Sequence, residues 1–529
     1  MHGSPLSRMS KTENQIDAIE EQQERSHEEI MFILVALMLA MLLAALDQTI
    51  VSTALPRIAT DLHGLNKLSW VATAYLLTSA VATPLYGKIG DQFGRKKIFQ
   101  SAIVIFLIGS ALCGLSQSID QLVAFRAIQG IGAGGLMVLA MTIIGDVVSP
   151  RQRGKYLGYI GSVFVLSSVA GPLLGGFFTD SLSWRWIFYI NLPLGALALV
   201  TIAARLHLPV KRSDKRIDYL GAALLAATAV PIILATVWGG ITYPWASTTI
   251  MGLFGGAALA CILFVLWERR LKLDAIIPMH MFKSSIFTVS VILSLLAGLA
   301  LFAGILFIPE YQQIVRGYSA VKSGLLLLPL VGGLMAMLVT SGRLITKTGH
   351  YRIFPIIGTL TTAFGLWLFS HLTLHTSQLT LSIWMVVLGA GIGSFMQVMT
   401  LAVQNAVPRS ELGVATATAT FFRTMGSSLG GAVFGAILIN RLLSHLHHLL
   451  PAAANGHVAI NASAVENGIP PTALAKLPPS VSHDVLQSFV LAFHDMFLLA
   501  IPFALLAFLV ALFLKEVPLR DTTKGPEVL

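Results

Sequence analysis

Three ionisable side chains of the sequence stand in or beside long apolar runs. They are Asp47, Arg126 and Glu310. A charge at the centre of a membrane-spanning helix costs at least about 2.5–3.5 kcal/mol unless it is paired or hydrated. A carboxyl group in such a place can bind and release protons, and a nearby arginine can tune its affinity for them. We therefore take these three residues as the candidates for proton coupling.

Asp47 is the leading candidate for the proton carrier. If a helix begins at Met31, Asp47 lies about 24 Å along it at 1.5 Å per residue, in the outer part of the span. The alternative is an aspartate bonded to Thr49 or to nearby backbone, which would fix the helix end. Arg126 likewise has two interpretations, because it could tune the carboxyl group or hold backbone carbonyls as a purely structural residue.

The roles of Glu310 and of two further charged residues are open. Glu310 follows more than twenty apolar residues and is either a second acid for cationic substrates or a residue of the outer interface. Asp146 and Arg423 form a candidate charge network. Asp146 could instead be a helix-end acid paired with Arg151 or Arg153, and Arg423 could contact an anion.

Two glycine-containing segments could control how helices move against one another. In the first, the glycines allow close approach of helix ends, and the acid could latch two halves of the protein or cap a facing helix. The alternative for this first segment, an ordinary basic loop, does not explain its Gly-Asp-Gly spacing. The second segment permits a kink and tight helix contact, although generic small-residue packing would use the same glycines. The residues are Gly87, Asp91, Gly94, Arg95, Lys96 and Lys97 in the first, and Gly171, Pro172, Gly175 and Gly176 in the second.

The composition shows what kind of protein must position these residues. Of 529 residues, 55% are hydrophobic and only 11% are charged, against about 25% charged in soluble domains, and the mean hydropathy is +0.78. Long continuous apolar runs exclude an outer-membrane barrel, whose strands would alternate. We therefore predict an all-α polytopic membrane protein.

Enzymatic chemistry has almost no support in the sequence. There is no Gly-x-x-x-x-Gly-Lys-Ser/Thr nucleotide loop, no nucleophile–base set and no metal-ligand cluster. The two cysteines, Cys113 and Cys261, have no partner spacing for a disulfide or metal site. We expect no cofactor and no catalytic or metal site, so that energy must come from an ion gradient or from the substrate itself. The net charge of +10 has a membrane explanation and does not indicate nucleic acid.

Apolar runs of about 20 residues, enough to cross the bilayer, occur fourteen times. Of the 35 Lys and Arg residues, 26 fall in the two tails and the loops on their side, and seven fall in the opposite loops. Basic residues prefer the cytoplasmic side, so both termini are predicted to be cytoplasmic. The predicted spans lie near 31–52, 69–88, 98–117, 122–144, 156–178, 186–206, 218–238, 249–267, 285–309, 321–342, 353–372, 379–401, 412–440 and 488–515.

The chain contains an internal repeat. Gly87 and Gly94 return as Gly342 and Gly349 at an offset of 255, and the Gly-x-Gly-x-Gly beginning at Gly130 returns 259 residues later. Two copies of a six-helix unit, related by an axis along the membrane normal, would produce this pattern. The predicted parts are a polar cytoplasmic tail (1–30), a first half (31–206), two inserted helices (218–267), a second half with outer loop 441–487 (285–515) and a cytoplasmic tail (516–529).

Five segments, in order along the chain, resemble motifs of the major facilitator superfamily. Together with fourteen spans, they resemble its fourteen-span drug:proton antiporters, and the likeness covers about residues 31–515. Within that family the first and last segments are the more specific to the drug antiporters. The Asp91 loop gates, the Arg126 segment is typical of proton-coupled members, and the Gly171 segment is typical of antiporters. In order, the segments are Leu46–Pro56, Gly87–Lys97, Leu122–Gly132, Gly171–Gly176 and Trp184–Gly195.

The resemblance implies a major facilitator fold and a proton-coupled antiporter. Such a protein would export hydrophobic or cationic drugs by alternating access, in a cell (inner or plasma) membrane, and would confer antibiotic resistance. Its partners would be small amphipathic or cationic substrates, protons and the lipid bilayer, and it would be a monomer, with accessory export partners left open. The alternatives are a proton-coupled lipid or glycolipid exporter, a metabolite–proton symporter and a non-transporting membrane scaffold.

Overall fold

The computed structural model describes residues 27–63, 67–206, 217–240, 242–272, 274–449 and 478–519. Most of the polar tail 1–30, residues 450–477 of the outer loop 441–487, and the tail from residue 520 lie outside the described residues.

The described part of the chain is helical throughout, with one isolated bridge between Gly239 and Tyr243. Serine N-caps begin several of the helices. Each accepts a bond from a backbone N–H of the following turn: Ser118, Ser247, Ser284 and Ser377. The elements are α2 (His27–Asp61), α3 (Leu68–Phe93), α4 (Arg95–Leu115), α5 (Ile119–Val147), α6 (Pro150–Ser181), α7 (Trp186–Tyr189), α8 (Asn191–Arg205), α9 (Tyr219–Trp238), α10 (Thr248–Leu271), η2 (Met279–Lys283), α11 (Ser285–Ile314), α12 (Ala320–Leu325), α13 (Leu328–Thr348), α14 (Ile353–Phe369), α15 (Gln378–Asn405), η3 (Arg409–Glu411), α16 (Leu412–Leu449) and α19 (Pro479–Leu512).

Twelve of the described helices are long and apolar enough to cross a membrane. The prediction of a helical multi-pass membrane protein is confirmed. The predicted spans 69–88 and 353–372 correspond to α3 and α14, which are not among the twelve. The α14 helix is apolar but only 17 residues long, whereas α3 carries Lys88, Asp91 and Gln92 at one end.

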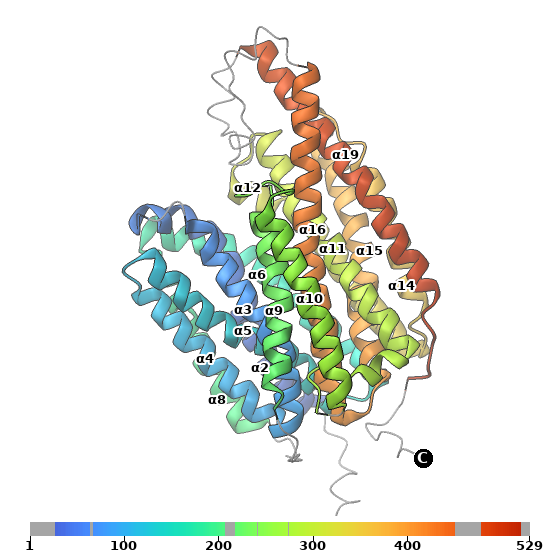
Figure 1. Ribbon diagram of the computed structural model, residues 1–529. Coiled ribbons are helices and arrows are strands. Elements are labelled where there is room, and N and C mark those ends of the chain that lie inside the picture. Colours follow the sequence, from blue (N-terminus) through green and yellow to red (C-terminus); the bar gives the residue numbers. More distant parts are fainter. Residues whose placement is uncertain are drawn as a thin grey trace, which may run out of the picture.

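The helices form two groups (Figure 1). Helices α2–α8, blue to cyan, make up the first bundle, and helices α11–α19, yellow to red, make up the second bundle. Each bundle has an apolar core of its own: Trp184 and Phe188 lie in one core of the first, and Phe369 and Phe497 lie in that of the second. A further core at one end includes side chains from both bundles. The bundles are therefore packed units joined mainly through a few crossing helices.

The inserted helices α9 and α10, green in Figure 1, lie in front of the junction between the bundles. Helix α9 contacts α3 of the first bundle and α16 of the second. Its apolar side chains, including Leu225 and Ile233, share a core with Leu77 of α3 and Phe421 of α16. Helix α9 thus covers the seam where the two bundles meet.

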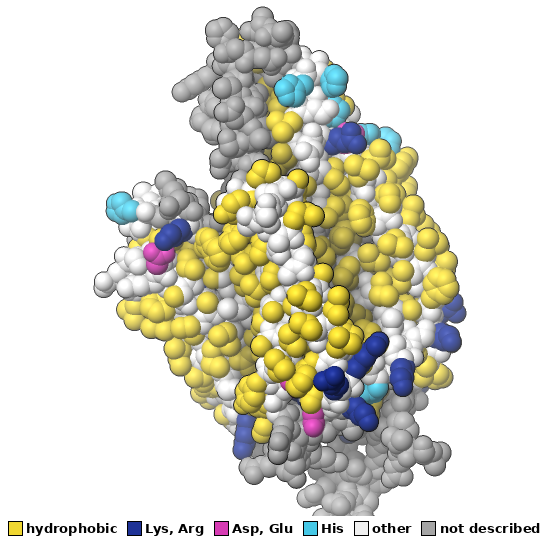
Figure 2. Space-filling view, viewed as in Figure 1, with side chains coloured by type: hydrophobic (Ala, Val, Ile, Leu, Met, Phe, Trp, Pro, Cys, Tyr) yellow, Lys and Arg dark blue, Asp and Glu magenta, His cyan; other side chains and the backbone are white. Residues whose placement is uncertain are grey.

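The outer surface of the helices is apolar, as a lipid-facing surface must be. Figure 2 shows a hydrophobic middle zone with nearly all visible charged side chains near the two ends of the molecule. Large side chains such as Val200, Leu259 and Leu379 are more than half exposed. The helices α16 and α19 rise beyond the others at the end opposite the C-terminus (Figure 1).

Candidate proton-coupling site and bundle latch

Asp47 and Arg126 form a fully buried ion pair within the first bundle. The Arg126 Nη1 atom donates to Asp47 Oδ2 at 2.5 Å, and the side chains are 2% and 0% exposed. Asp47 comes from the middle of α2 and Arg126 from the first third of α5. In such a place each charge is stable only because the other offsets it.

Arg126 is held in place by several partners. Its Nε atom donates to the carbonyl of Val71 at 3.1 Å, Nη1 donates to Gln129 Oε1 at 2.8 Å, and the guanidinium lies 4.1 Å from the ring centroid of Tyr75. Arg126 therefore makes the contacts of both proposed roles, because it pairs with an acid and also binds a backbone carbonyl. Its other partners fix the orientation of the guanidinium toward Asp47.

Glycines give α5 its position. An ideal Cβ on Gly130 would lie 2.2 Å from the Thr78 hydroxyl of α3, and one on Gly132 would lie 2.4 Å from the Phe106 backbone nitrogen of α4. Only glycine lets α5 approach α3 and α4 this closely. The glycine run therefore fixes the depth at which Arg126 enters the bundle.

Two amides complete the shell of Asp47. Gln129 Nε2 donates to Asp47 Oδ1 at 2.8 Å, and Asn191 Nδ2 donates to the same oxygen at 3.4 Å and to Ser110 Oγ at 3.0 Å. Neither amide was selected as a site residue from the sequence. Both lie in segments that resemble family motifs, Leu122–Gly132 and Trp184–Gly195, and a polar amide within a mainly apolar segment is the signal that could have found them.

The alternative interpretation of Asp47, a bond to Thr49, is not what the structure shows. The Thr49 hydroxyl lies against the carbonyls of Ala45, Leu46 and Ser167 instead. The bond to Ser167 connects α2 to α6. The Asp47 carboxylate is thus free of local capping and faces Arg126, Gln129 and Asn191.

The Gly171 segment packs α6 against the helix that carries Asp47. An ideal Cβ on Gly171 would lie 2.1 Å from Thr49 Oγ1, and one on Gly175 would lie 2.0 Å from Thr53 Oγ1. Gly176 has no atom within 4 Å of such a Cβ. Gly171 and Gly175, but not Gly176, are therefore needed for close contact with α2, and Pro172 lies inside the helix between them.

The Asp91 loop joins the two bundles at one end of the molecule, which we call the latch end. Asp91 Oδ1 accepts from the backbone N–H of Gly413 at 3.1 Å, and Oδ2 accepts from Val414 N–H at 3.0 Å. These donors belong to the first turn of α16, whose N-terminus favours negative charge. An acid of the first bundle thus caps a helix of the second.

Arg95 and Asp146 extend this latch. Arg95 donates to Asp91 Oδ1 through Nε at 3.0 Å, donates to the Arg409 carbonyl at 2.9 Å and pairs with Asp146. Arg409 donates in turn to the Asp146 carbonyl at 2.9 Å. Asp146 therefore joins the charge network. Arg153 donates to the carbonyl of Val148.

The two lysines of the motif lie outside this network. Lys96 donates to the carbonyl of Ala203 on α8, within the first bundle. Lys97 is exposed and takes part in no ion pair among the described residues. The latch is built from Asp91 and Arg95.

Two close glycine–glycine contacts between the bundles are related by the internal repeat of the sequence. Gly87 of α3 packs on Gly413 of α16, and Gly342 of α13 packs on Gly154 of α6. In each pair an ideal Cβ on either glycine would lie within 2.8 Å of the other's carbonyl oxygen. The four residues are related by offsets of 255 and 259, the offsets of the repeated motifs. Both crossings join one bundle to the other.

Glu310 and Arg423 lie apart from the Asp47 pair and from the latch. Both belong to the second bundle and are half-buried, and neither takes part in an ion pair among the described residues. Arg423 lies eleven residues, or about 17 Å, along α16 from its first residue. It is therefore not part of a network with Asp146.

The C-terminal segment closes on the loop between α13 and α14. Glu516 Oε1 accepts from Tyr351 N–H at 2.6 Å and from Arg352 N–H at 3.3 Å, and Oε2 lies 3.2 Å from His350 Nδ1. Burial alone would raise the pKa of Glu516, but the two backbone donors and His350 outweigh it and lower that pKa. Glu516 is therefore held as an anion.

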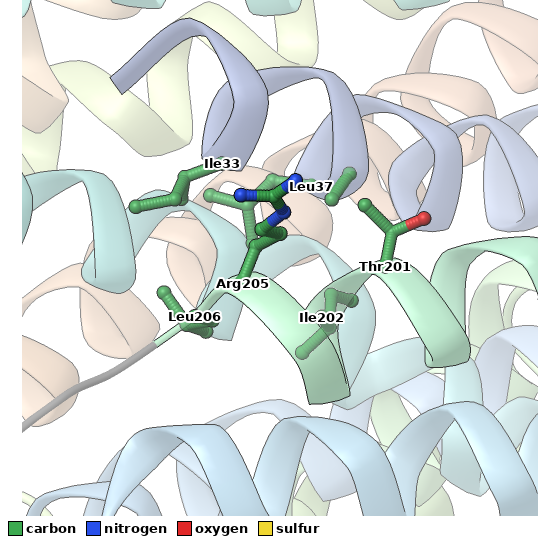
Figure 3. A pocket seen from close by; sticks show the side chains of 7 residues that line it. Ile33, Leu37, Thr201, Ile202, Arg205 and Leu206 are labelled. Carbon is green, nitrogen blue, oxygen red and sulfur yellow. The ribbon is translucent and has the colours of Figure 1, made fainter. Parts of the chain in front are cut away.

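A small crevice between α2 and α8 does not resemble a substrate site. Figure 3 shows Arg205 reaching from α8 toward α2 above Ile202 and Leu206, with Ile33 and Leu37 on the facing helix. The Arg205 guanidinium lies 5.2 Å from the ring centroid of Phe32. The crevice is narrow and mainly apolar. No group of three or more metal-ligating side chains occurs among the described residues.

Comparison with known proteins decides the family. The model of the Major Facilitator Superfamily matches residues 37–431. The chain belongs to this superfamily. It is a family of transporters and not of enzymes. Two solved structures share the fold: the human organic anion transporter MFSD10 (TM-score 0.59, 16% identity, 91% of this chain and 100% of that one) and the proton:xylose symporter XylE (TM-score 0.57, 16% identity, 90% and 96%).

Several curated major facilitator proteins are similar over most of this chain. An uncharacterized MFS-type transporter of Mycobacterium tuberculosis is 42% identical over 92% of this chain and 70% of its own length. Multidrug resistance protein 3 of Bacillus subtilis is 35% identical over 93% and 96%. The multidrug transporter protein MdtP of the same organism is 34% identical over 92% and 94%.

Proposed function

We propose that this major facilitator protein is a proton-coupled antiporter that exports hydrophobic or cationic compounds. The observation that carries the proposal is the sealed Asp47–Arg126 pair. A carboxylate with an arginine and two amide donors around it is an anion whose protonation would break its strongest bond. Binding one proton there changes the charge of the bundle interior by one unit.

The geometry suggests how proton binding could reach the substrate path. Asp47 lies one half-turn before Thr49, where α2 contacts Gly171 of α6. Helix α6 crosses to α13 of the second bundle through Gly154 and Gly342. A change in the Asp47 pair would act on α2, then on α6, and so on the crossing between the bundles. The proposed transport cycle is alternating access by rocking of two six-helix halves, 31–206 and 285–515.

In this proposal the latch end is cytoplasmic, and the structure has the latch closed. Both termini and the Asp91 loop would face the cytoplasm of a cell membrane crossed fourteen times, with α3 and α14 as the two further spans. Protons entering from outside would protonate Asp47 as substrate leaves outward. No cofactor is required, because the proton gradient supplies the energy.

Drug export is favoured over other cargo by the names of similar proteins. Two relatives at 34% and 35% identity are called a multidrug transporter and a multidrug resistance protein.

Glu310 would add affinity for cations. It is half-buried in α11 and has no ion-pair partner among the described residues. The Glu310→Gln variant should then weaken export of ethidium and leave export of a neutral dye unchanged.

The test of the function is ethidium efflux from energised cells that carry the protein. Efflux should stop when an uncoupler is added and in the Asp47→Asn variant. Uptake driven by an inward proton gradient would point instead to a symporter. A changed lipid composition of the outer leaflet, with no dye movement, would point to a lipid exporter. Loss of a partner protein without any flux would point to a scaffold.

A further inference from the structure

The inserted helices carry two buried acids whose role the transport proposal does not use. Asp218 is the residue before α9 and Glu268 lies in the last turn of α10. They are 8% and 0% exposed. Helix α10 leads through residues 274–278 and η2 to α11. The acids therefore lie where the inserted helices join the second bundle.

One oxygen of each acid holds a neighbouring element. Asp218 Oδ1 accepts from Gly221 N–H at 2.8 Å and from Trp267 Nε1 at 2.9 Å. Glu268 Oε2 accepts from Ile277 N–H at 3.0 Å. These bonds join the start of α9, the end of α10 and the segment that leads into the second bundle.

The other oxygen of each acid has no hydrogen-bond donor among the residues that the structure describes. Asp218 Oδ2 and Glu268 Oε1 are both buried without a partner. Both oxygens lie beside Gly221, because an ideal Cβ on that residue would lie 2.0 Å from Asp218 Oδ2 and 2.6 Å from Glu268 Oε1. The two oxygens are therefore at most 4.6 Å apart, the sum of these two distances. Two buried carboxylates so close cannot both be ionised at low cost, whereas a single proton between them satisfies both oxygens.

No cation offsets this pair among the described residues. The nearest basic side chains, Arg269, Arg270 and Lys272, are exposed, and none pairs with either acid. His280 of η2 lies 3.1 Å from Glu411 instead. Asp274, half-buried, follows α10. The surfaces that α3 and α16 turn toward α9 are apolar, with side chains such as Leu77, Ala80, Phe421 and Met425.

We propose that Asp218 and Glu268 share one proton, and that this carboxyl–carboxylate bond clamps the inserted helices to the second bundle. With the proton bound, α9 and α10 stay attached to residues 276–277. When the proton is lost, repulsion between the carboxylates opens the clamp. Docking of the inserted helices then depends on the pH at that end of the molecule, whatever the protein transports.

Hydrogen exchange of the full-length protein in lipid nanodiscs tests the clamp, with the Ile277 N–H as the probe. After correction for the intrinsic rate, exchange in the wild type should rise about tenfold per pH unit over the range in which the closed pair still holds the proton and the open pair has released it. In that range opening is coupled to release of one proton. In Glu268→Gln the amide can accept from Ile277 and donate to Asp218 Oδ2 at every pH. Its corrected exchange should therefore stay flat.

A spectroscopic measurement checks the same proton independently of the exchange. Infrared difference spectra between neutral and alkaline pH should show loss of a protonated carboxyl band in the wild type. The band should be absent in Asp218→Asn and in Glu268→Gln and retained in Asp274→Asn, the matched control. Equal pH profiles of Ile277 exchange in the wild type and Glu268→Gln, or a carboxyl band that survives both substitutions, would overturn the proposal.

Discussion

The Asp47 carboxylate and the Arg126 guanidinium are 2.5 Å apart at a depth where neither is exposed to solvent. The two residues are 79 positions apart in the chain and come from different helices. Each of them would be an uncompensated buried charge without the other. Their pairing links the stability of the first bundle to the charge state of the proposed proton carrier.

Removal of Arg126 alone should therefore be far more damaging than removal of both charges. We predict that Arg126→Leu destabilises the protein by about 3–5 kcal/mol, the cost of breaking a buried pair from one side. The double variant Asp47→Asn/Arg126→Leu should recover most of that loss without recovering transport. Unfolding in detergent, followed by the reactivity of Cys113, measures both. Equal destabilisation of the single and double variants would show that Arg126 acts through packing alone.

The contact between α6 and α2 predicts unequal effects of neighbouring glycines. Gly175→Ala places a methyl group 2.0 Å from Thr53 Oγ1 and 3.0 Å from the Ile50 carbonyl, so α2 must shift. Overpacking of this kind costs about 1–3 kcal/mol and should lower the rate of ethidium efflux severalfold. Gly176→Ala enters open space and is the matched control. Indistinguishable efflux by the two variants would remove the contact as a cause.

We predict that the negative charge of Asp91 holds the two bundles together at the latch end. Asp91→Asn keeps the shape but weakens the bonds to Gly413 and Val414, because a neutral amide oxygen is a poorer acceptor than a carboxylate. We expect a cysteine introduced at Ala417, fully buried beside Gly87, to become reactive to an aqueous maleimide. Lys97→Gln, at an exposed position, should leave that cysteine protected. Protection in both variants would mean that glycine packing closes the latch without Asp91.

The C-terminal clasp at Glu516 should depend on pH in a stated direction. The lowered pKa of Glu516 means that its bonds stabilise the closed clasp above the usual titration range of glutamate and lose that effect as the pH falls through the lowered value. Glu516→Gln should therefore speed exchange of the Tyr351 N–H at pH 7, with no difference from the wild type at a pH below the lowered pKa of Glu516. Lys515→Gln, an exposed neighbour, is the control. A difference that persists at acid pH would contradict this origin.

Much of the fold could be predicted because a membrane leaves few options. Apolar runs of sufficient length can only be helices there, and composition alone predicted the helical class, which is confirmed. Two of the fourteen predicted spans, α3 and α14, are not among the twelve helices that are long and apolar enough to cross a membrane. Helix α3 has a polar end, and α14 is short. Helix α14 still has an apolar outer face, on which Ile353, Ile357 and Leu360 are about half exposed.

The site was only partly visible in the sequence. Asp47 and Arg126 stood out because charges are rare in apolar runs, and tuning of Asp47 by Arg126 was one of two interpretations. One sequence does not show that residues 79 positions apart are in contact. The donors to Asp91 are the backbone N–H groups of Gly413 and Val414, which carry no side-chain signal. Asp218 and Glu268 were not selected from the sequence, because only the fold brings an oxygen of each beside Gly221.

The central claim is that protonation of Asp47 drives export. Its most direct test uses liposomes that contain purified protein, an outward-directed ethidium gradient and a pH-sensitive dye. The wild type should move protons inward as ethidium leaves, and Asp47→Asn, which keeps the size and hydrogen bonding of the side chain, should lose the proton movement. Inward proton movement of normal size in Asp47→Asn, coupled to normal ethidium export, would contradict the claim.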